Sequence, residues 1–192
     1  LNILSIDFIF AKAKMSYEYD YCEPTLNCDK HIVIKNAKHP LIAKDIMVPL
    51  SIEMGDGIDT IIVTGPNTGG KTVFLKTLGL ICLMAKAGMH VPADTAQLYI
   101  FDRIFADIGD EQSIEQSLST FSSHLKNIRN IIFAANSESL VLCDELGSGT
   151  DPVEGAALAI AIINKIRKKQ SFAAVTTHYS ELKTYAIEKD GV

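Results

Sequence analysis

The chain has 192 residues, 47% of them hydrophobic, and a formal net charge of −5. This length and apolar content suit one domain with one substantial core, and the acidic balance excludes bulk electrostatic attraction to nucleic acid. No apolar stretch reaches the roughly 18 residues of a membrane span, and we expect no signal peptide. We therefore expect a cytoplasmic protein with no membrane partner, and free thiols rather than disulfides at its four cysteines.

A helix is predicted first, over about residues 2–19, because apolar residues recur there at three- and four-residue steps. Its apolar stripe is wide enough to need partners on two sides. One interpretation is that the helix packs into the core of this domain. An irregular, acidic link is expected to follow, to about Asp29.

The rest of the chain alternates between predicted strands and helices, which indicates an α/β sandwich with a largely parallel central sheet. The early strands suit a small antiparallel side sheet. Strands are expected near 31–35, 50–54, 60–64, 97–101, 103–107, 139–143 and 173–178, and helices near 71–89, 117–135, 152–169 and from 180 onward.

A glycine-rich segment between the strand at 60–64 and the helix at 71–89 has the G-x-x-x-x-G-K-[ST] spacing of a phosphate-binding loop. Its glycines would let backbone N–H groups surround a polyphosphate at the helix N-terminus. Lys71 would reach the β- and γ-phosphates, and the Thr72 hydroxyl would ligate Mg²⁺. The alternative is a turn that merely joins strand to helix. The predicted phosphate-binding residues are Gly65, Pro66, Asn67, Thr68, Gly69, Gly70, Lys71 and Thr72.

Two carboxylates, Asp144 and Glu145, follow the apolar run at 139–143. Carboxylates at the end of a buried strand are costly unless they meet a cation, and Mg²⁺ supplies one. We therefore assign Asp144 to the metal and Glu145 to the general base that takes a proton from the attacking water. The alternative is that both acids cap the next helix.

A histidine, His178, stands at the polar end of the apolar run at 173–177. If the sheet is parallel, His178 shares one edge with the glycine loop and the two acids. It can then bond the γ-phosphate or orient water, which makes it a third candidate catalytic residue beside Lys71 and Glu145. The alternative is an ordinary loop or cap residue.

Taken together, these segments resemble the ATPase domain of the MutS family, a branch of the ABC-type ATPases. The resemblance implies the P-loop NTPase fold of ABC type, ATP and Mg²⁺ as ligands, and ATP hydrolysis. It covers about residues 36–192 and rests on NAKHP at 36–40, GPNTGGKT at 65–72, SLSTFSSH at 117–124, LVLCDELGSGTDPVEGAALA at 140–159 and TTHYSEL at 176–182.

Two features favour the type-two bacterial branch of that family. Mismatch-sensing members usually have Met at the position of Thr68 and D-E-I-G-R-G-T-S after the metal strand, whereas this chain has DELGSGTDPVEG at 144–155. The resemblance associates the type-two branch with suppression of DNA recombination and with rescue of stalled ribosomes rather than with classical mismatch repair. The endonuclease of that branch belongs to a separate C-terminal domain, and no residues in this chain would carry it.

The resemblance also assigns residues to a neighbouring subunit. In ABC-type ATPases a signature segment closes over the nucleotide held by the partner, and Ser119 and Thr120 match the MutS version of that segment. Asp151 matches the loop that crosses the dimer interface. The implied assembly is a head-to-tail homodimer with ATP between the subunits. Hydroxyls at the start of a helix also suit N-capping, which is compatible with this role.

Three further expectations follow from the resemblance. The polar link between Asp107 and Gln116 takes the place of the Q-loop, so Gln112 is a candidate for contact with Mg²⁺ or the attacking water; an acidic surface loop is the alternative. Residues 1–29 would be the end of a lever helix and its link, and 30–192 an ATPase domain truncated at its C-terminal end. DNA would be contacted through regions missing from this chain.

The competing functions are an ATP-gated clamp that does not turn over and the ATPase domain of a mismatch-sensing MutS. Glu145 argues against a pure clamp, because a clamp needs no general base. An ABC ATPase of transporters or chromosome-structure proteins would carry an L-S-G-G-Q-type signature, whose glycines are missing from 117–121.

Overall fold

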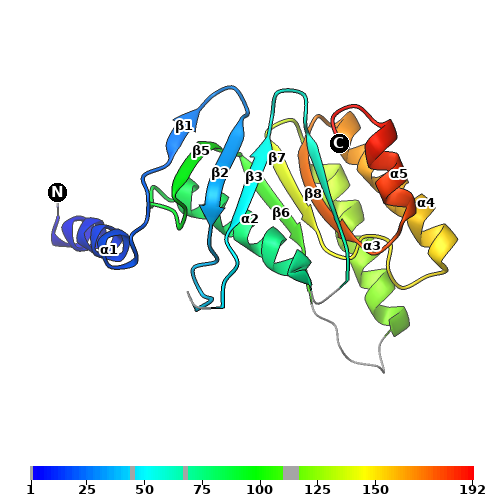
Figure 1. Cartoon of the computed structure of the whole chain (residues 1–192), viewed down its shortest axis with the longest axis horizontal. Helices are drawn as coiled ribbons and strands as arrows, with labels where there is room; N and C mark the ends of the chain where they lie inside the picture. The colour runs from blue at the N-terminus through cyan, green and yellow to red at the C-terminus, as the bar shows by residue number, and fades with distance from the viewer. Residues whose placement is uncertain (1, 44–45, 67–68, 110–116) are drawn as a thin grey trace. The chain divides into compact units, whose positions relative to one another are not determined.

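The computed structural model describes residues 2–43, 46–66, 69–109 and 117–192, with only the backbone described at 117–120. The chain divides into two compact units: Leu1–Asp56 with Thr77–Ile100, and Gly57–Lys76 with Phe101–Val192. Each unit contains one four-stranded sheet (Figure 1). The predicted α/β class, with a parallel sheet and a second sheet, is confirmed.

The sheet of the first unit is mixed. Its strand order is β1-β5-β2-β3, in which β2 runs antiparallel to β3 and β5 while β1 runs parallel to β5. The predicted small antiparallel side sheet is therefore antiparallel at β2, β3 and β5. The prediction was wrong at β1, a parallel strand of three residues that lies where an irregular link was expected. So short a strand shows no alternation of apolar and polar residues. The bounds are β1 Thr25–Asn27, β2 Ile32–Ala37, β3 Leu50–Met54 and β5 Thr95–Tyr99.

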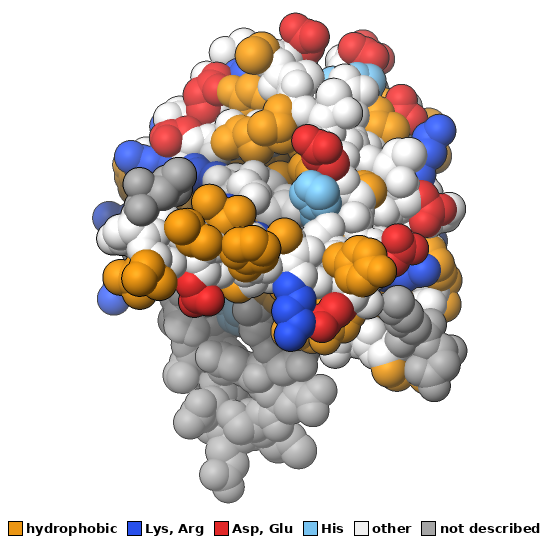
Figure 2. All heavy atoms as spheres, turned by 90° about the vertical axis from the view of Figure 1, so that its left-hand side faces the viewer, with side chains coloured by type: hydrophobic (Ala, Val, Ile, Leu, Met, Phe, Trp, Pro, Cys, Tyr) orange, Lys and Arg blue, Asp and Glu red, His pale blue; other side chains and the backbone are white. Residues whose placement is uncertain are grey.

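Helix α1, Ile3–Tyr19, begins at Asn2, whose side-chain Oδ1 accepts a hydrogen bond from the Ser5 N–H at 3.0 Å. No residue of α1 is buried, so the interpretation in which it packs into the core is wrong. Lys12 donates to the Ala87 carbonyl at 3.3 Å within the same unit. Apolar side chains gather on the face shown in Figure 2, and the exposed ones from α1 are Ile3, Leu4, Ile6, Phe8, Ile9, Phe10, Tyr17 and Tyr19.

The sheet of the second unit is fully parallel, in the order β4-β8-β7-β6. Every residue of β7 and β8 is buried, which is typical of central strands in a sheet covered on both faces. Its strands are β4 Thr60–Thr64, β6 Arg103–Asp107, β7 Ser139–Cys143 and β8 Phe172–Thr177.

Helices α3, Ser117–Ala134, α4, Pro152–Lys168, and α5, Glu181–Glu188, share one core with β7 and β8. The side chains that alternate onto this face of the sheet come from Val141, Cys143, Ala173 and Val175.

Helix α2, Lys71–Lys86, starts directly after the glycine loop. It ends three residues before its predicted end, because Gly88 takes a positive φ of +66° and the Met89 N–H turns back to the Met84 carbonyl at 3.0 Å. Within the residues that the structure describes, no helix is long and apolar enough to cross a membrane.

Candidate functional site

The carboxyl ends of all four parallel strands meet at one edge of the second sheet. Thr64 pairs with Thr177, Cys143 with Val175, and Asp107 with Cys143. The glycine loop, the two acids and His178 all follow directly from these strand ends. Open α/β sheets bind their ligands at this edge, so the segments singled out in the sequence converge on one place.

Asp144 is held by hydroxyl groups from two other segments. Thr72 Oγ1 donates to Asp144 Oδ2 at 2.6 Å, and Thr176 Oγ1 donates to the other carboxylate oxygen, Oδ1. The structure therefore brings together Thr72 and Asp144, the two residues predicted to share Mg²⁺. Carboxylate and hydroxyl oxygens suit Mg²⁺, which keeps several waters and needs few protein ligands.

Glu145 adopts a backbone conformation that is rare for a residue with a side chain. Its φ is +47°, in the left-handed region that costs an L-residue about 1–2 kcal/mol. Thr176 holds the segment in place, because its Oγ1 accepts the Glu145 N–H at 2.8 Å and its carbonyl accepts the Leu146 N–H at 2.9 Å. Backbone strain of this kind often accompanies functional sites. Thr176 thus orients both acids, a role that was not predicted.

The loop after the acids packs against Tyr179. The Tyr179 hydroxyl donates to the Gly147 carbonyl at 2.8 Å, and the residue is only 5% exposed. Gly147 has a φ of +86°, and a Cβ built on Gly155 would lie 2.6 Å from the Gly147 carbonyl oxygen. The backbones of Gly147 and Gly155 therefore lie too close together for a side chain to fit at either position. Tyr179 was quoted in the T-H-Y run, but the sequence alone did not indicate that its ring packs inward.

The glycine loop leads into a buried lysine. Gly70 has a φ of +78°, a conformation that suits glycine. Lys71 is 5% exposed and its Nζ donates to the Gly65 carbonyl at 2.6 Å. The ammonium group therefore lies back over the loop that precedes it. Asn67 and Thr68, also predicted for phosphate binding, lie outside the described residues.

A buried acid, Asp107, lies next to this site. Asn127 Nδ2 donates to its Oδ1 at 2.7 Å and His124 Nδ1 to its Oδ2 at 2.9 Å. Burial, and after it the nearby charges of Asp107 and Asp144, raise the pKa of the Cys143 thiol. His124 was only the last residue of the quoted run at 117–124, with no role assigned to it, and Asn127 was not singled out. They lie 17 and 20 residues from Asp107 in the sequence.

Asp151, predicted to lie at a dimer interface, has a structural role in this chain. Asp151 is the N-cap of α4, where its Oδ1 accepts the N–H groups of Val153 at 2.9 Å and Glu154 at 3.4 Å. Neither predicted acid caps this helix, so the capping interpretation of Asp144 and Glu145 was wrong.

His178 is exposed, and its ring centroid lies 4.2 Å from that of Tyr179. It follows β8 rather than ending it. Ser119 and Thr120 lie in the first turn of α3, but their side chains are outside the described part of the chain, as is the whole of Gln112.

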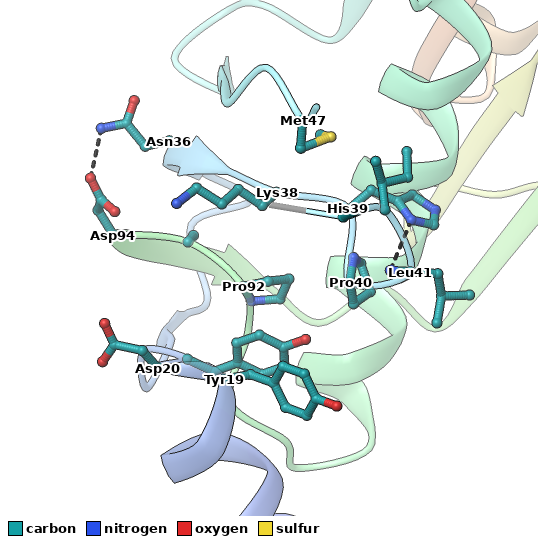
Figure 3. Close-up of a pocket in the computed structure, with 14 residues that line it drawn as sticks. Tyr19, Asp20, Asn36, Lys38, His39, Pro40, Leu41, Met47, Pro92 and Asp94 are labelled. Carbon is teal, nitrogen blue, oxygen red and sulfur yellow. Dashed lines mark hydrogen bonds between the residues drawn. The ribbon is translucent and has the colours of Figure 1, made fainter. Parts of the chain in front are cut away.

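The first unit contains a separate cavity of about 470 Å³ (Figure 3). Its lining includes Asn36, His39 and Pro40 of the N-x-x-H-P segment. Asn36 Nδ2 donates to Asp94 Oδ2 at 2.6 Å at its rim. None of the residues predicted to bind phosphate or metal lines this cavity.

Comparison with known proteins gives consistent matches. The family model described as MutS domain V matches residues 61–192. A protein named Endonuclease MutS2 from Alkaliphilus oremlandii is 60% identical over 188 residues, which are 97% of this chain and 24% of that protein.

Proteins of the same name from Alkaliphilus metalliredigens and Clostridioides difficile are 58% and 55% identical, over 99% and 97% of this chain and 24% of each relative. The chain spans about a quarter of the length of the curated relatives that it matches.

Proposed function

Because the chain belongs to the MutS domain V family, we propose that it is the ATP-binding and ATP-hydrolysing part of a MutS-type protein that acts on DNA. The observation that carries this proposal is the contact of Thr72 with Asp144 at the carboxyl edge of a parallel sheet. A hydroxyl at the start of a helix and a strand-end carboxylate are the pair that holds Mg²⁺ in P-loop NTPases. The fold we propose is accordingly that of an ABC-type P-loop NTPase.

Each residue then has a distinct task. Thr72 and Asp144 would hold Mg²⁺, which would neutralise negative charge on the phosphates. Lys71 would turn from the Gly65 carbonyl to the phosphates. Glu145 would take a proton from the attacking water, and the hydrogen bond from its N–H to Thr176 Oγ1 at 2.8 Å supports a fixed backbone position for that carboxylate. His178, exposed beside the same edge, would orient the water or bond the γ-phosphate.

We further propose that two copies assemble head to tail, with ATP between them. The first turn of α3, with Ser119 and Thr120, would face the nucleotide held by the partner, and Asp151 would lie in the loop at the interface. ATP would join the two copies and hydrolysis would release them. The DNA that is clamped would be bound by parts of the protein outside this chain.

The identity to proteins named Endonuclease MutS2 favours the type-two branch over a mismatch-sensing one. A role in limiting recombination or in ribosome rescue would follow from that placement. The non-hydrolysing clamp is the second candidate, and the strained backbone at Glu145 argues against it, because a clamp gains nothing from a fixed general base.

The experiment that tests this proposal is Mg²⁺-ATP turnover per subunit, measured across a wide range of concentration of the intact protein. Glu145→Gln serves as the blank. We expect specific activity to rise with protein concentration and to fall about 10²- to 10⁴-fold in the blank. A rate that is negligible, or equal in the blank, would contradict hydrolysis at this site.

The proposed trans role has its own test, the variant Ser119→Ala. It should bind ATP as wild type does but lose the rise of activity with concentration. Hydrolysis and dimerisation equal to those of wild type would show that Ser119 does not serve a neighbouring subunit.

A further inference from the structure

Asp107 touches two parts of the candidate site at once. Its backbone carbonyl accepts the Asp144 N–H at 2.9 Å. Its side chain is held from α3, by Asn127 Nδ2 at 2.7 Å and His124 Nδ1 at 2.9 Å. One residue at the end of β6 therefore joins the acid proposed to hold Mg²⁺ to the helix proposed to serve a second subunit.

The side chain of Asp107 is only 7% exposed. A buried carboxylate is costly unless hydrogen bonds compensate for the lost water, and here each oxygen has a donor from α3. Separating α3 from β6 would leave this carboxylate without those donors. Breaking these hydrogen bonds therefore costs free energy, whereas breaking an ion pair on the surface costs little.

Helix α3 makes a further contact on the same face. Phe121, His124 and Asn127 are spaced by three residues, so they lie on one side of the helix. Phe121 packs against the loop after Glu145, because a Cβ built on Gly149 would lie 3.2 Å from Phe121 Cβ. Contacts at these three positions fix both the rotation and the axial position of α3. The first turn of the helix, with positions 119 and 120, therefore moves with the rest of α3.

We propose that Asp107, His124 and Asn127, the coupling triad, transmit the state of the nucleotide site at Asp144 to the first turn of α3. These are positioning residues, and none of them touches the reacting atoms. The inference rests on the proposed function, since it concerns the same site and its partner subunit. Coupling of this kind is reciprocal, so contact of a second subunit with α3 would change nucleotide affinity at Asp144 by the same factor.

Four variants of the intact protein test the triad. His124→Leu and Asn127→Ala each remove a donor to Asp107, whereas His124→Asn keeps an amide N–H near the position of Nδ1. Asn130→Ala is the matched control, because Asn130 is an exposed asparagine of the same helix. For each variant we would measure specific activity against protein concentration, and the affinity of dilute protein for a fluorescent ATP analogue with Mg²⁺.

We expect His124→Leu and Asn127→Ala to raise the concentration for half-maximal activity at least about five-fold, with the affinity of dilute protein nearly unchanged. His124→Asn should restore wild-type behaviour, and Asn130→Ala should not differ from it. An unchanged half-maximal concentration in both donor-deleting variants would overturn the inference. So would a parallel loss of nucleotide affinity, no rescue by His124→Asn, or an equal effect of Asn130→Ala.

Hydrogen exchange in dilute protein separates this inference from the proposed function, because it does not depend on dimerisation. Mg²⁺-ATP should protect amides of both 139–147 and α3 in wild type, and only those of 139–147 in Asn127→Ala. If activity of wild type is flat with concentration but α3 gains this protection, the dimer proposal fails and the coupling stands. If α3 gains no protection in wild type, the coupling fails.

Discussion

The two sheets differ in what they bury. In the strands of the mixed sheet every buried residue is apolar, whereas the parallel sheet buries Thr60, Asp107, Ser139, Thr176 and Thr177. Buried polar groups are costly unless they are hydrogen-bonded. Asp107 and Thr176 have such bonds at the carboxyl edge, where the acids lie. The buried polar residues of the strands therefore all lie in the parallel sheet, and Asp107, Thr176 and Thr177 lie at its carboxyl edge.

The largest expected difference between the two units is in kcat, when an aspartate of each unit is replaced by asparagine. Asp144→Asn should lower kcat about 10³-fold, equivalent to about 4 kcal/mol, because a metal ligand is lost. Asp94→Asn alters an aspartate of the first unit that also accepts a side-chain hydrogen bond, from Asn36, and should leave kcat unchanged. Steady-state ATPase assays with a Mg²⁺ titration measure both. A comparable loss in Asp94→Asn would show that the first unit takes part in the chemistry.

A smaller effect is expected from Thr176→Val, which removes the hydroxyl that joins Asp144 to the Glu145 N–H. Loss of a residue that orients a metal ligand typically lowers activity or metal affinity about 10- to 100-fold. Thr60→Val is the control from the opposite edge of the same sheet, since Thr60 is also buried and donates to Asp59 at 2.6 Å. The control should lose stability in urea unfolding but keep kcat. Equal kcat in the two variants would contradict a role specific to Thr176.

Gly155→Ala tests the packing that holds the loop after the acids. Helix propensity alone predicts a gain of about 1 kcal/mol, but the added Cβ would lie 2.6 Å from the backbone oxygen of Gly147. Overpacking of this kind costs about 1–3 kcal/mol, so we expect a net loss in the free energy of unfolding. Gly109→Ala, where a Cβ meets nothing within 4 Å, should change stability by less than about 0.5 kcal/mol. Chemical denaturation followed by circular dichroism distinguishes them.

The smallest expected effect is the difference in reactivity between the buried and the exposed cysteine thiols. Cys82 in the first unit and Cys143 in the second are buried, whereas Cys28 is exposed. Burial raises the pKa of Cys82 from 9.0 to about 12. Stability linked to this thiol is therefore present below pH 9 and is lost as pH rises towards 12.

Alkylation with iodoacetamide at pH 8, followed by mass spectrometry, should modify Cys28 first and Cys82 and Cys143 only after unfolding. At intermediate urea concentrations, alkylation of Cys82 then measures opening of the first unit, and alkylation of Cys143 measures opening of the second. Identical alkylation rates throughout the transition would show that the two units open together.

The parallel sheet was largely predictable from the sequence. The runs at 60–64, 103–107 and 139–143 were placed with their observed bounds. Polar residues or glycine flank the first and the last of these runs on both sides, and every residue of the last is buried. The mixed sheet was less predictable. Its β1 has three residues, and β5 begins two residues before its predicted start because an exposed threonine, Thr95, opens it.

The site was predictable only in part. The glycine loop and the acids carry local spacing that indicates phosphate and metal chemistry, and their assignments stay predictions. The supports of the site lack such spacing: Thr176 is 32 residues from Asp144, and His124 is 17 residues from Asp107. These pairs form only when the sheet brings its strands together. Nothing in a single sequence marks a threonine in an apolar run as a partner for a distant acid.

Glu145 has a left-handed backbone, with a φ of +47°. Selection for folding and selection for ATP turnover should therefore favour different residues at this position. In a library of all residues at this position, a screen for folding alone should enrich glycine, which relieves about 1 kcal/mol of strain. A screen for ATP turnover should recover glutamate and discard glycine. The residue that wins each screen would separate what this position costs the fold from what it gives the reaction.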